Sequence, residues 1–156
     1  MVTSNLMDAI RVVKENEIKT SDSYREASKN LTNPLGRDLF VKLSDFERFH
    51  YERISALEKS LLETGKFIQY EGREFPLPPV FEIKAAEEAH TKSVMQIISE
   101  ARDLEVIAEK AYASLAEQVP DQLGKDMFEK LSAEEHIHFI ILSDAYWSLN
   151  QTGKWK

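Results

Sequence analysis

The chain has 156 residues, a formal net charge of −7 and a pI of about 5.2, so it lacks the basic face that binding to nucleic acid or an anionic membrane requires. It contains no cysteine, which excludes disulfides, iron–sulfur clusters, thiolate zinc sites and thiol nucleophiles. Neither a membrane span nor a signal peptide is apparent. The absence of cysteine makes a reducing cytoplasm the expected compartment, and the length suits a single domain, residues 1–156.

The composition predicts long helices, because only 5 Gly and 5 Pro interrupt a chain rich in Ala, Glu, Lys and Leu. In chain order, we expect helices at residues 4–31, 34–63, 81–117 and 122–149. Asn33 and Asp121 are suitable N-caps for the second and fourth helices, and Gly65 and Gly153 follow these helices as stop signals. The proline-rich segment 64–80 is long enough, when extended, to run the length of a bundle.

The two halves of the chain repeat each other at a constant offset of 88 residues, as from His50 to His138. The aligned pairs include Glu17 with Glu105, Tyr24 with Tyr112, Glu47 with Glu135, and Lys42-Leu43-Ser44 with Lys130-Leu131-Ser132. Two similar helical hairpins, residues 1–63 and 81–150, explain this pattern most simply. We therefore predict an all-α four-helix bundle whose hairpins are joined by a long crossover at 64–80.

Polar residues interrupt the predicted buried face of every helix. Apolar residues recur there at alternating steps of three and four, which is the spacing of a bundle seam. Six seam positions are acidic or histidine instead: Glu17, Glu47, His50, Glu105, Glu135 and His138. Counting helix rise from the turns places all six at one level, and both members of each Glu-x-x-His pair point inward because i and i+3 share a face.

This layer predicts a site for two metal ions. Four carboxylates in a dry layer repel one another, and an isolated buried ion costs several kcal/mol. Two divalent cations would balance the four charges, and mixed carboxylate and imidazole ligands suit iron or manganese, with zinc as a further choice. A single seam Glu or His is usually a structural polar residue, but six at one level and one offset favour a metal site.

Two tyrosines on the same seams, Tyr24 and Tyr112, lie two turns beyond Glu17 and Glu105. They have two interpretations of equal weight. Each hydroxyl either hydrogen-bonds a ligand carboxylate across the bundle, or belongs to an ordinary core tyrosine with some other polar partner.

Other acidic and histidine residues are less promising. Glu87 and His90 make a further Glu-x-x-His, but it has no repeat partner, and we interpret it as part of a solvated face. Glu134 and His136 flank the fourth-helix motif off the seam, so we expect both to be exposed or at a contact.

Four segments together resemble the rubrerythrin branch of the ferritin-like superfamily: EIKTSDSY at 17–24, ERFH at 47–50, EVIAEKAY at 105–112 and EEHIH at 134–138. The resemblance covers nearly the whole chain and implies a ferritin-like four-helix bundle with a di-iron centre. It implies that the iron ligands are Glu17, Glu47, His50, Glu105, Glu135 and His138. It further implies that Glu47 and Glu135 bridge the ions and that Tyr24 and Tyr112 stand behind the ligands.

The chain departs from this family in two respects. Full rubrerythrins append a four-cysteine iron domain that supplies electrons; with no cysteine here, a separate donor such as a rubredoxin-type protein is implied. Peroxide-reducing members carry an extra ligand glutamate three residues after the position of Glu105. That position is Ala108 here, and Glu109 is the nearest substitute as an additional ligand.

We therefore predict a redox enzyme that reduces peroxide or dioxygen at a di-iron centre. The alternatives are a ferritin-like protein that binds or oxidises Fe(II), and a non-enzymatic bundle that its metal merely stabilises. We also expect a homodimer or larger homo-oligomer.

Overall fold

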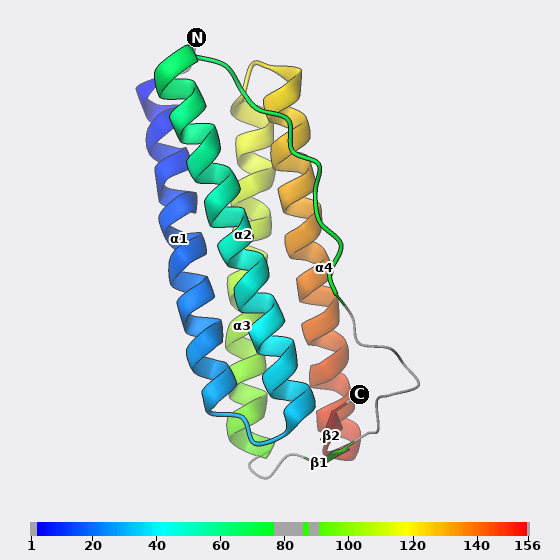
Figure 1. The fold of residues 1–156 in the computed structure, drawn as a ribbon. Coiled ribbons are helices and arrows are strands. Elements are labelled where there is room, and N and C mark those ends of the chain that lie inside the picture. The colour runs from blue at the N-terminus through cyan, green and yellow to red at the C-terminus, as the bar shows by residue number, and fades with distance from the viewer. Residues whose placement is uncertain (1–2, 77–85, 88–90, 156) are drawn as a thin grey trace.

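Four long α-helices form the protein in the computed structural model, which describes residues 3–76, 86–87 and 91–155. The helices are α1 (Ser4–Lys29), α2 (Pro34–Thr64), α3 (Thr91–Gln118) and α4 (Gln122–Thr152). In Figure 1, α1 and α2 make one antiparallel hairpin, and α3 and α4 make a second beside it. The predicted all-α four-helix bundle of two hairpins is thereby confirmed.

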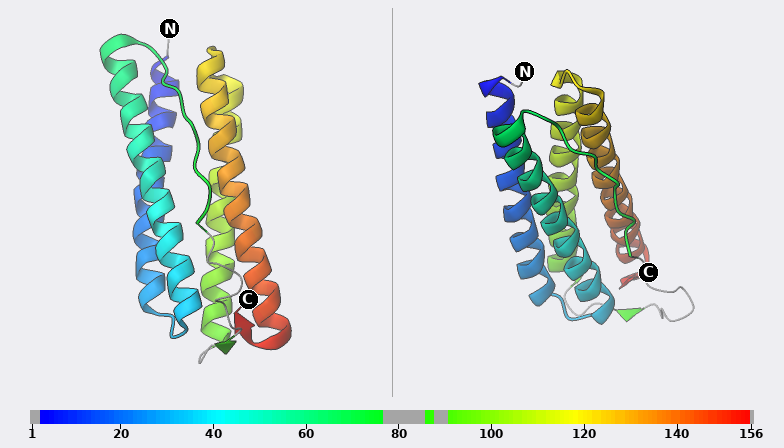
Figure 2. Two further views of the ribbon diagram at one scale, coloured as in Figure 1. Left: turned by 45° about the vertical axis from the view of Figure 1, so that its right-hand side comes forward. Right: turned by 45° about the horizontal axis from the view of Figure 1, so that its top comes forward.

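The crossover begins after α2 and runs back along α4 without regular secondary structure over residues 65–76 (Figures 1 and 2). Because it returns along the bundle, α3 starts at the end where α2 starts, and the two helices run in the same direction. Within the described part of the chain, no helix is long and apolar enough to cross a membrane.

The prediction that the third helix starts at residue 81 is wrong, because the described residues 86–87 form a strand. Ala86–Glu87 form a two-residue strand, β1, which pairs antiparallel with β2 (Lys154–Trp155) beyond α4. The described helix begins only at Thr91. The local Ala- and Glu-rich sequence favours helix, but pairing with the C-terminal strand overrides that propensity. His90 of the discounted motif lies outside the described residues.

The predicted caps are confirmed. The side chains of Asn33 and Asp121 each accept a hydrogen bond from the backbone N–H two residues later, and so satisfy a free donor of the first turn. Gly65 and Gly153 end α2 and α4 with φ of 71°, the left-handed conformation that glycine adopts without a Cβ penalty.

The apolar core is divided by the polar layer into two clusters. One contains Ile10, Leu57 and Val119, and the other contains Leu31, Phe40 and Ile98. Between them α1 and α3 each contribute one buried glutamate, whereas α2 and α4 each contribute a Glu-x-x-His pair. The fold therefore places the six seam residues halfway along the bundle, with dry packing on both sides.

Two equivalent contacts between an aromatic ring and a glycine also join the two hairpins. Phe67 follows α2 and packs on Gly124 of α4, while its repeat partner Trp155 follows α4 and packs on Gly36 of α2. Both aromatic side chains are buried. A Cβ at Gly36 would lie 2.5 Å from the Trp155 ring, and one at Gly124 would lie 2.7 Å from the Phe67 ring. Only glycine allows this approach.

Gly36→Ala is therefore expected to lower the free energy of unfolding by about 1–3 kcal/mol, the usual cost of overpacking a core. Urea denaturation of the apoprotein measures the change. In a Trp155→Leu background the same substitution should cost less, because the smaller side chain can move aside. An equal cost in both backgrounds would show that the clash is not with Trp155.

Candidate metal centre

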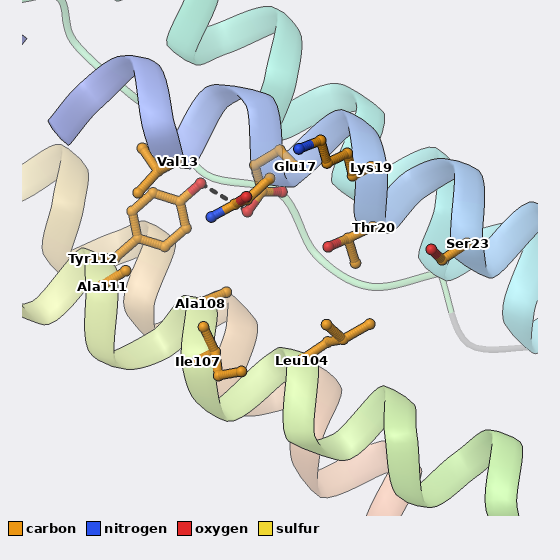
Figure 3. Close-up of a pocket in the computed structure, with 11 residues that line it drawn as sticks. Val13, Glu17, Lys19, Thr20, Ser23, Leu104, Ile107, Ala108, Ala111 and Tyr112 are labelled. Carbon is orange, nitrogen blue, oxygen red and sulfur yellow. Dashed lines mark hydrogen bonds between the residues drawn. The ribbon is translucent and has the colours of Figure 1, made fainter. Parts of the chain in front are cut away.

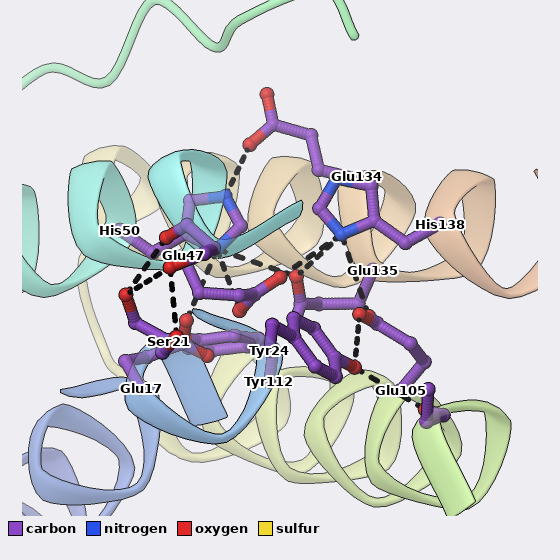
Figure 4. A network of polar contacts seen from close by, with 12 residues as sticks. Glu17, Ser21, Tyr24, Glu47, His50, Glu105, Tyr112, Glu134, Glu135 and His138 are labelled. Carbon is purple, nitrogen blue, oxygen red and sulfur yellow. Dashed lines mark hydrogen bonds and ion pairs between the residues drawn. The ribbon is translucent and has the colours of Figure 1, made fainter. Parts of the chain in front are cut away.

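The six seam residues come together in one buried layer (Figure 4). None of the six is more than 3% exposed. Their ligand atoms form two groups, within each of which all atoms lie within 4.8 Å of one another. The first group is Glu17, Glu47, His50 and Glu135; the second is Glu47, Glu105, Glu135 and His138. The buried Glu and His groups can thus hold metal, and ions in both groups would share Glu47 and Glu135.

Unpartnered atoms support a cation in this layer. Besides His138 Nε2, five polar atoms of the layer are buried without a hydrogen-bond partner: Glu17 Oε2, Glu47 Oε2, His50 Nδ1, Glu105 Oε2 and Glu135 Oε1. His50 Nδ1 lies 3.4 Å from Glu17 Oε2 and 3.3 Å from Glu135 Oε1, so these lone pairs face a common space. An unsatisfied buried polar group costs about 1–3 kcal/mol, and a bound cation removes that cost for several groups at once.

The electrostatics show how crowded the carboxyl groups are. Burial, reinforced by the neighbouring Glu47 carboxyl, raises the pKa of Glu17 from 4.5 to about 8. Burial and the carboxyls of Glu135 and Glu47 raise the pKa of Glu105 well above its ordinary value. Without metal, the layer relieves its repulsion by taking up protons. Metal ions would displace these protons, so metal affinity must fall as the pH falls.

The pKa values of both histidines are raised, although burial by itself would lower them. Burial alone would lower the pKa of His50, but the hydrogen bond with Glu134 and the nearby Glu135 carboxyl raise it well above 6.5. For His138 burial again lowers the pKa, and the charge of Glu105 together with hydrogen bonds to the surrounding carboxyls raises it. The acidic environment therefore favours a cation at this level, whether imidazolium or metal.

The two tyrosines reach across between the hairpins. Tyr24 on α1 donates its hydroxyl to Glu105 on α3 at 2.8 Å, and Tyr112 on α3 donates to Glu17 on α1 at 2.9 Å. Burial first, and then the nearby carboxyls, raise both tyrosine pKa values, so the phenols stay protonated as donors. Of the two interpretations left open, these bonds favour the one in which the tyrosines position ligand carboxylates.

Glu134 is the site residue that the sequence reasoning missed. It is buried, and its Oε1 lies 2.8 Å from His50 Nε2, on the side of the ring away from the layer. The crossover holds it in place: Tyr70 donates its hydroxyl to Oε1, and the Arg73 backbone N–H donates to Oε2 at 2.6 Å. Burial would raise the Glu134 pKa, but these hydrogen bonds lower it below its usual value. Glu134 thus orients His50 so that Nδ1 faces the layer.

The repeat is broken at this position. Glu134 corresponds to Phe46, and the Phe46 ring packs edge-on against His138 at 4.5 Å between centroids. His138 Nε2 consequently has no hydrogen-bond partner, whereas His50 Nε2 has a carboxylate. The two halves of the layer therefore differ in the basicity of their histidines. Aligning the two repeats places Glu134 opposite Phe46. Because a phenylalanine is usually buried, this alignment could have indicated from the sequence that Glu134 is buried too.

The structure does not bring Glu109, the proposed additional ligand, to the layer. Its carboxylate lies 3.0 Å from His136 Nδ1 on the bundle surface, and α3 stays α-helical throughout, without the bulge that would turn Glu109 inward. His136 is exposed as expected. We predict that Glu109→Ala leaves the metal content per chain unchanged, whereas Glu105→Ala lowers it. Elemental analysis after anaerobic loading measures both, and an equal loss in the two variants would contradict the placement.

No family model matches the chain, and no curated protein matches it. The solved structure of a hypothetical protein from Pyrococcus furiosus is similar, with a TM-score of 0.74 over 94% of this chain and 90% of that chain. The two sequences are 19% identical over this match. A likeness at this identity shows the shared bundle fold, and the metal centre rests on the residues of this chain alone.

Proposed function

We propose that this protein is a di-iron carboxylate redox protein that reduces peroxide or dioxygen. The observation that carries the proposal is the pair of overlapping ligand groups with Glu47 and Glu135 in common. Four carboxyls and two imidazoles suit iron better than metals that prefer sulfur, and manganese and zinc are the other metals that this set would accept. The resemblance to the rubrerythrin branch supports the same assignment.

An iron pair would supply two electrons to a bound oxidant, one from each ion. Under this proposal, Glu17 and His50 would hold one ion and Glu105 and His138 would hold the other. Glu47 and Glu135, which belong to both ligand groups, would serve both ions. The tyrosines fix the terminal carboxylates from across the bundle. The apolar clusters on both sides of the layer along the bundle lower the local dielectric, which strengthens every charge interaction within it.

The proposal includes an external source of electrons. No cysteine is present to bind an iron–sulfur or rubredoxin-type centre within the chain. A separate donor of the rubredoxin type would therefore re-reduce the metal pair after each turnover. Assembly as a homodimer or larger homo-oligomer remains part of the proposal.

The test is stopped-flow oxidation of the anaerobically reduced, iron-loaded protein, with hydrogen peroxide and dioxygen supplied separately. We expect peroxide to react faster, on the basis of the rubrerythrin-like ligand set, although Ala108 stands where peroxidase relatives keep a carboxylate. A large advantage for dioxygen would shift the assignment to an oxidase or ferroxidase. No reaction with either would contradict a redox role and favour a bundle stabilised by metal.

A further inference from the structure

A pocket between α1 and α3 leads from the surface to one side of the metal centre (Figure 3). Glu17 and Tyr112 line its inner end, joined by the hydrogen bond between the tyrosine hydroxyl and Glu17 Oε1. The pocket holds about 340 Å³, whereas a water molecule takes up only about 30 Å³ of the liquid. This volume falls in the range of organic-ligand sites, roughly 300–1,000 Å³, and far exceeds what dioxygen or hydrogen peroxide needs.

On the opposite face of the layer, the described residues of the crossover cover the helices. There the crossover lies over the groove between α2 and α4, as Figure 2 shows, and places Arg73 above the rings of Phe46 and Phe49 at 5.3 and 5.2 Å. Phe75 stacks on Phe46 and contacts His138. A ligand therefore approaches the centre from the α1–α3 side.

The two walls of the pocket differ in chemistry, although the repeat relates them. Apart from Val13 and Glu17, the α1 wall consists of four polar residues: Asn16, Lys19, Thr20 and Ser23. The α3 wall carries the repeat partners of these residues, and all four are apolar: Leu104, Ile107, Ala108 and Ala111. The halves have thus kept the same ligand layer while diverging at each equivalent position of this pocket. Such walls fit a molecule with one apolar side and one polar end.

Ala108 has a particular part in this shape. Its small side chain leaves open volume beside Glu17. Ala111, one turn further along α3, widens the same space. The two alanines together leave room for an organic substituent.

We propose that this pocket binds an organic hydroperoxide, with its apolar substituent against the α3 wall and its O–O group toward Glu17 and Tyr112. The proposal rests on the proposed redox function. In the reaction the O–O bond breaks and each oxygen takes up one proton, so the products are an alcohol and water. The two electrons come from the reduced metal pair, each ion losing one, and the separate donor restores them.

The binding test uses cumyl alcohol, the product from cumene hydroperoxide, and the redox-inert Zn(II)-loaded protein. Titration followed by amide NMR shifts should locate the alcohol at Thr20, Ala108 and Ala111. Ala108→Leu, which fills the pocket, should weaken binding by at least about tenfold, as excess carbon does in a confined apolar site. Ala113→Leu is the matched control on an exposed position of α3 and should bind as the unmodified protein does.

The reaction test oxidises the reduced, iron-loaded protein with cumene hydroperoxide and with hydrogen peroxide. Ala108→Leu should slow oxidation by cumene hydroperoxide at least about tenfold more than oxidation by hydrogen peroxide, since crowding hinders the larger oxidant more strongly. Ile107→Ser, a change at an exposed rim position, should also weaken cumyl alcohol binding without filling the pocket.

The outcomes separate this inference from the function on which it rests. Equal behaviour of Ala108→Leu and Ala113→Leu toward both cumyl compounds would overturn the pocket assignment, even if hydrogen peroxide still oxidises the protein. If neither peroxide reacts, the redox function fails, and the NMR titration alone decides whether the pocket binds the organic molecule.

Discussion

Anaerobic addition of Fe(II) or Mn(II) to the apoprotein is expected to raise the free energy of unfolding by about 2.7 kcal/mol for each occupied site, at a free metal concentration 100 times the dissociation constant. The increase arises because the buried layer exists only in the folded chain. Five unpartnered atoms and the crowded carboxyls gain a cation when the metal binds.

Urea denaturation with and without metal measures this effect, with a chelator in the apoprotein samples. Glu135→Ala should abolish most of the increase, because Glu135 belongs to both ligand groups. Glu129→Ala, an exposed substitution on the same helix, is the matched control and should retain it. Stabilisation that survives Glu135→Ala would place the metal elsewhere on the protein.

The stability of the apoprotein is expected to fall as the pH rises from about 5 to 8. Glu17 has a pKa of about 8 when folded and 4.5 as the ordinary value, so the native state binds more protons than the unfolded state in this window. Such a group stabilises the fold fully below pH 4.5 and loses that contribution as the pH passes the folded pKa. Each group of this kind contributes a slope of up to about 1.4 kcal/mol per pH unit.

The other groups of the layer act in the same direction. Glu105, His50 and His138 all have raised pKa values, so each retains its proton in the folded state at a pH where the unfolded chain has lost it. The groups with lowered values, Glu58 and Glu134, lose their contribution only as the pH falls below about 4.5, outside the window. The summed loss is therefore larger than that of Glu17 alone.

Urea denaturation in the presence of a chelator at pH 5, 6.5 and 8 measures this slope. Glu17→Gln should flatten it and stabilise the apoprotein at pH 8, because the amide keeps an acceptor for Tyr112 and cannot ionise. Glu15→Gln, exposed on the same helix, should leave the slope unchanged. Apoprotein stability that is constant or rises from pH 5 to 8 would contradict the protonation described for the layer.

Much of the layer could be predicted because helices impose regular geometry on local sequence. The i, i+3 spacing of Glu47 and His50 determines that both face inward, and counting helix rise from the turns correctly places Glu17 at the same level. Asn33 and Gly65 were recognisable because capping depends on neighbouring backbone groups.

The remaining features depend on contacts between distant segments. Tyr70 and Arg73 lie in an aperiodic crossover, whose path over α4 has no signal in local spacing. Their hydrogen bonds hold Glu134 against His50, although the local sequence suggests that Glu134 is exposed. The strand at Ala86–Glu87 likewise depends on a partner more than 60 residues away, at Lys154–Trp155.

Metal stoichiometry tests most directly whether the six buried residues form a centre for two metal ions. Protein loaded anaerobically with Fe(II) and freed of excess metal should contain two ions per chain by elemental analysis. Glu47→Ala should lower the content of both positions, because Glu47 is common to both ligand groups. Fewer than one ion per chain in the unmodified protein would contradict the account.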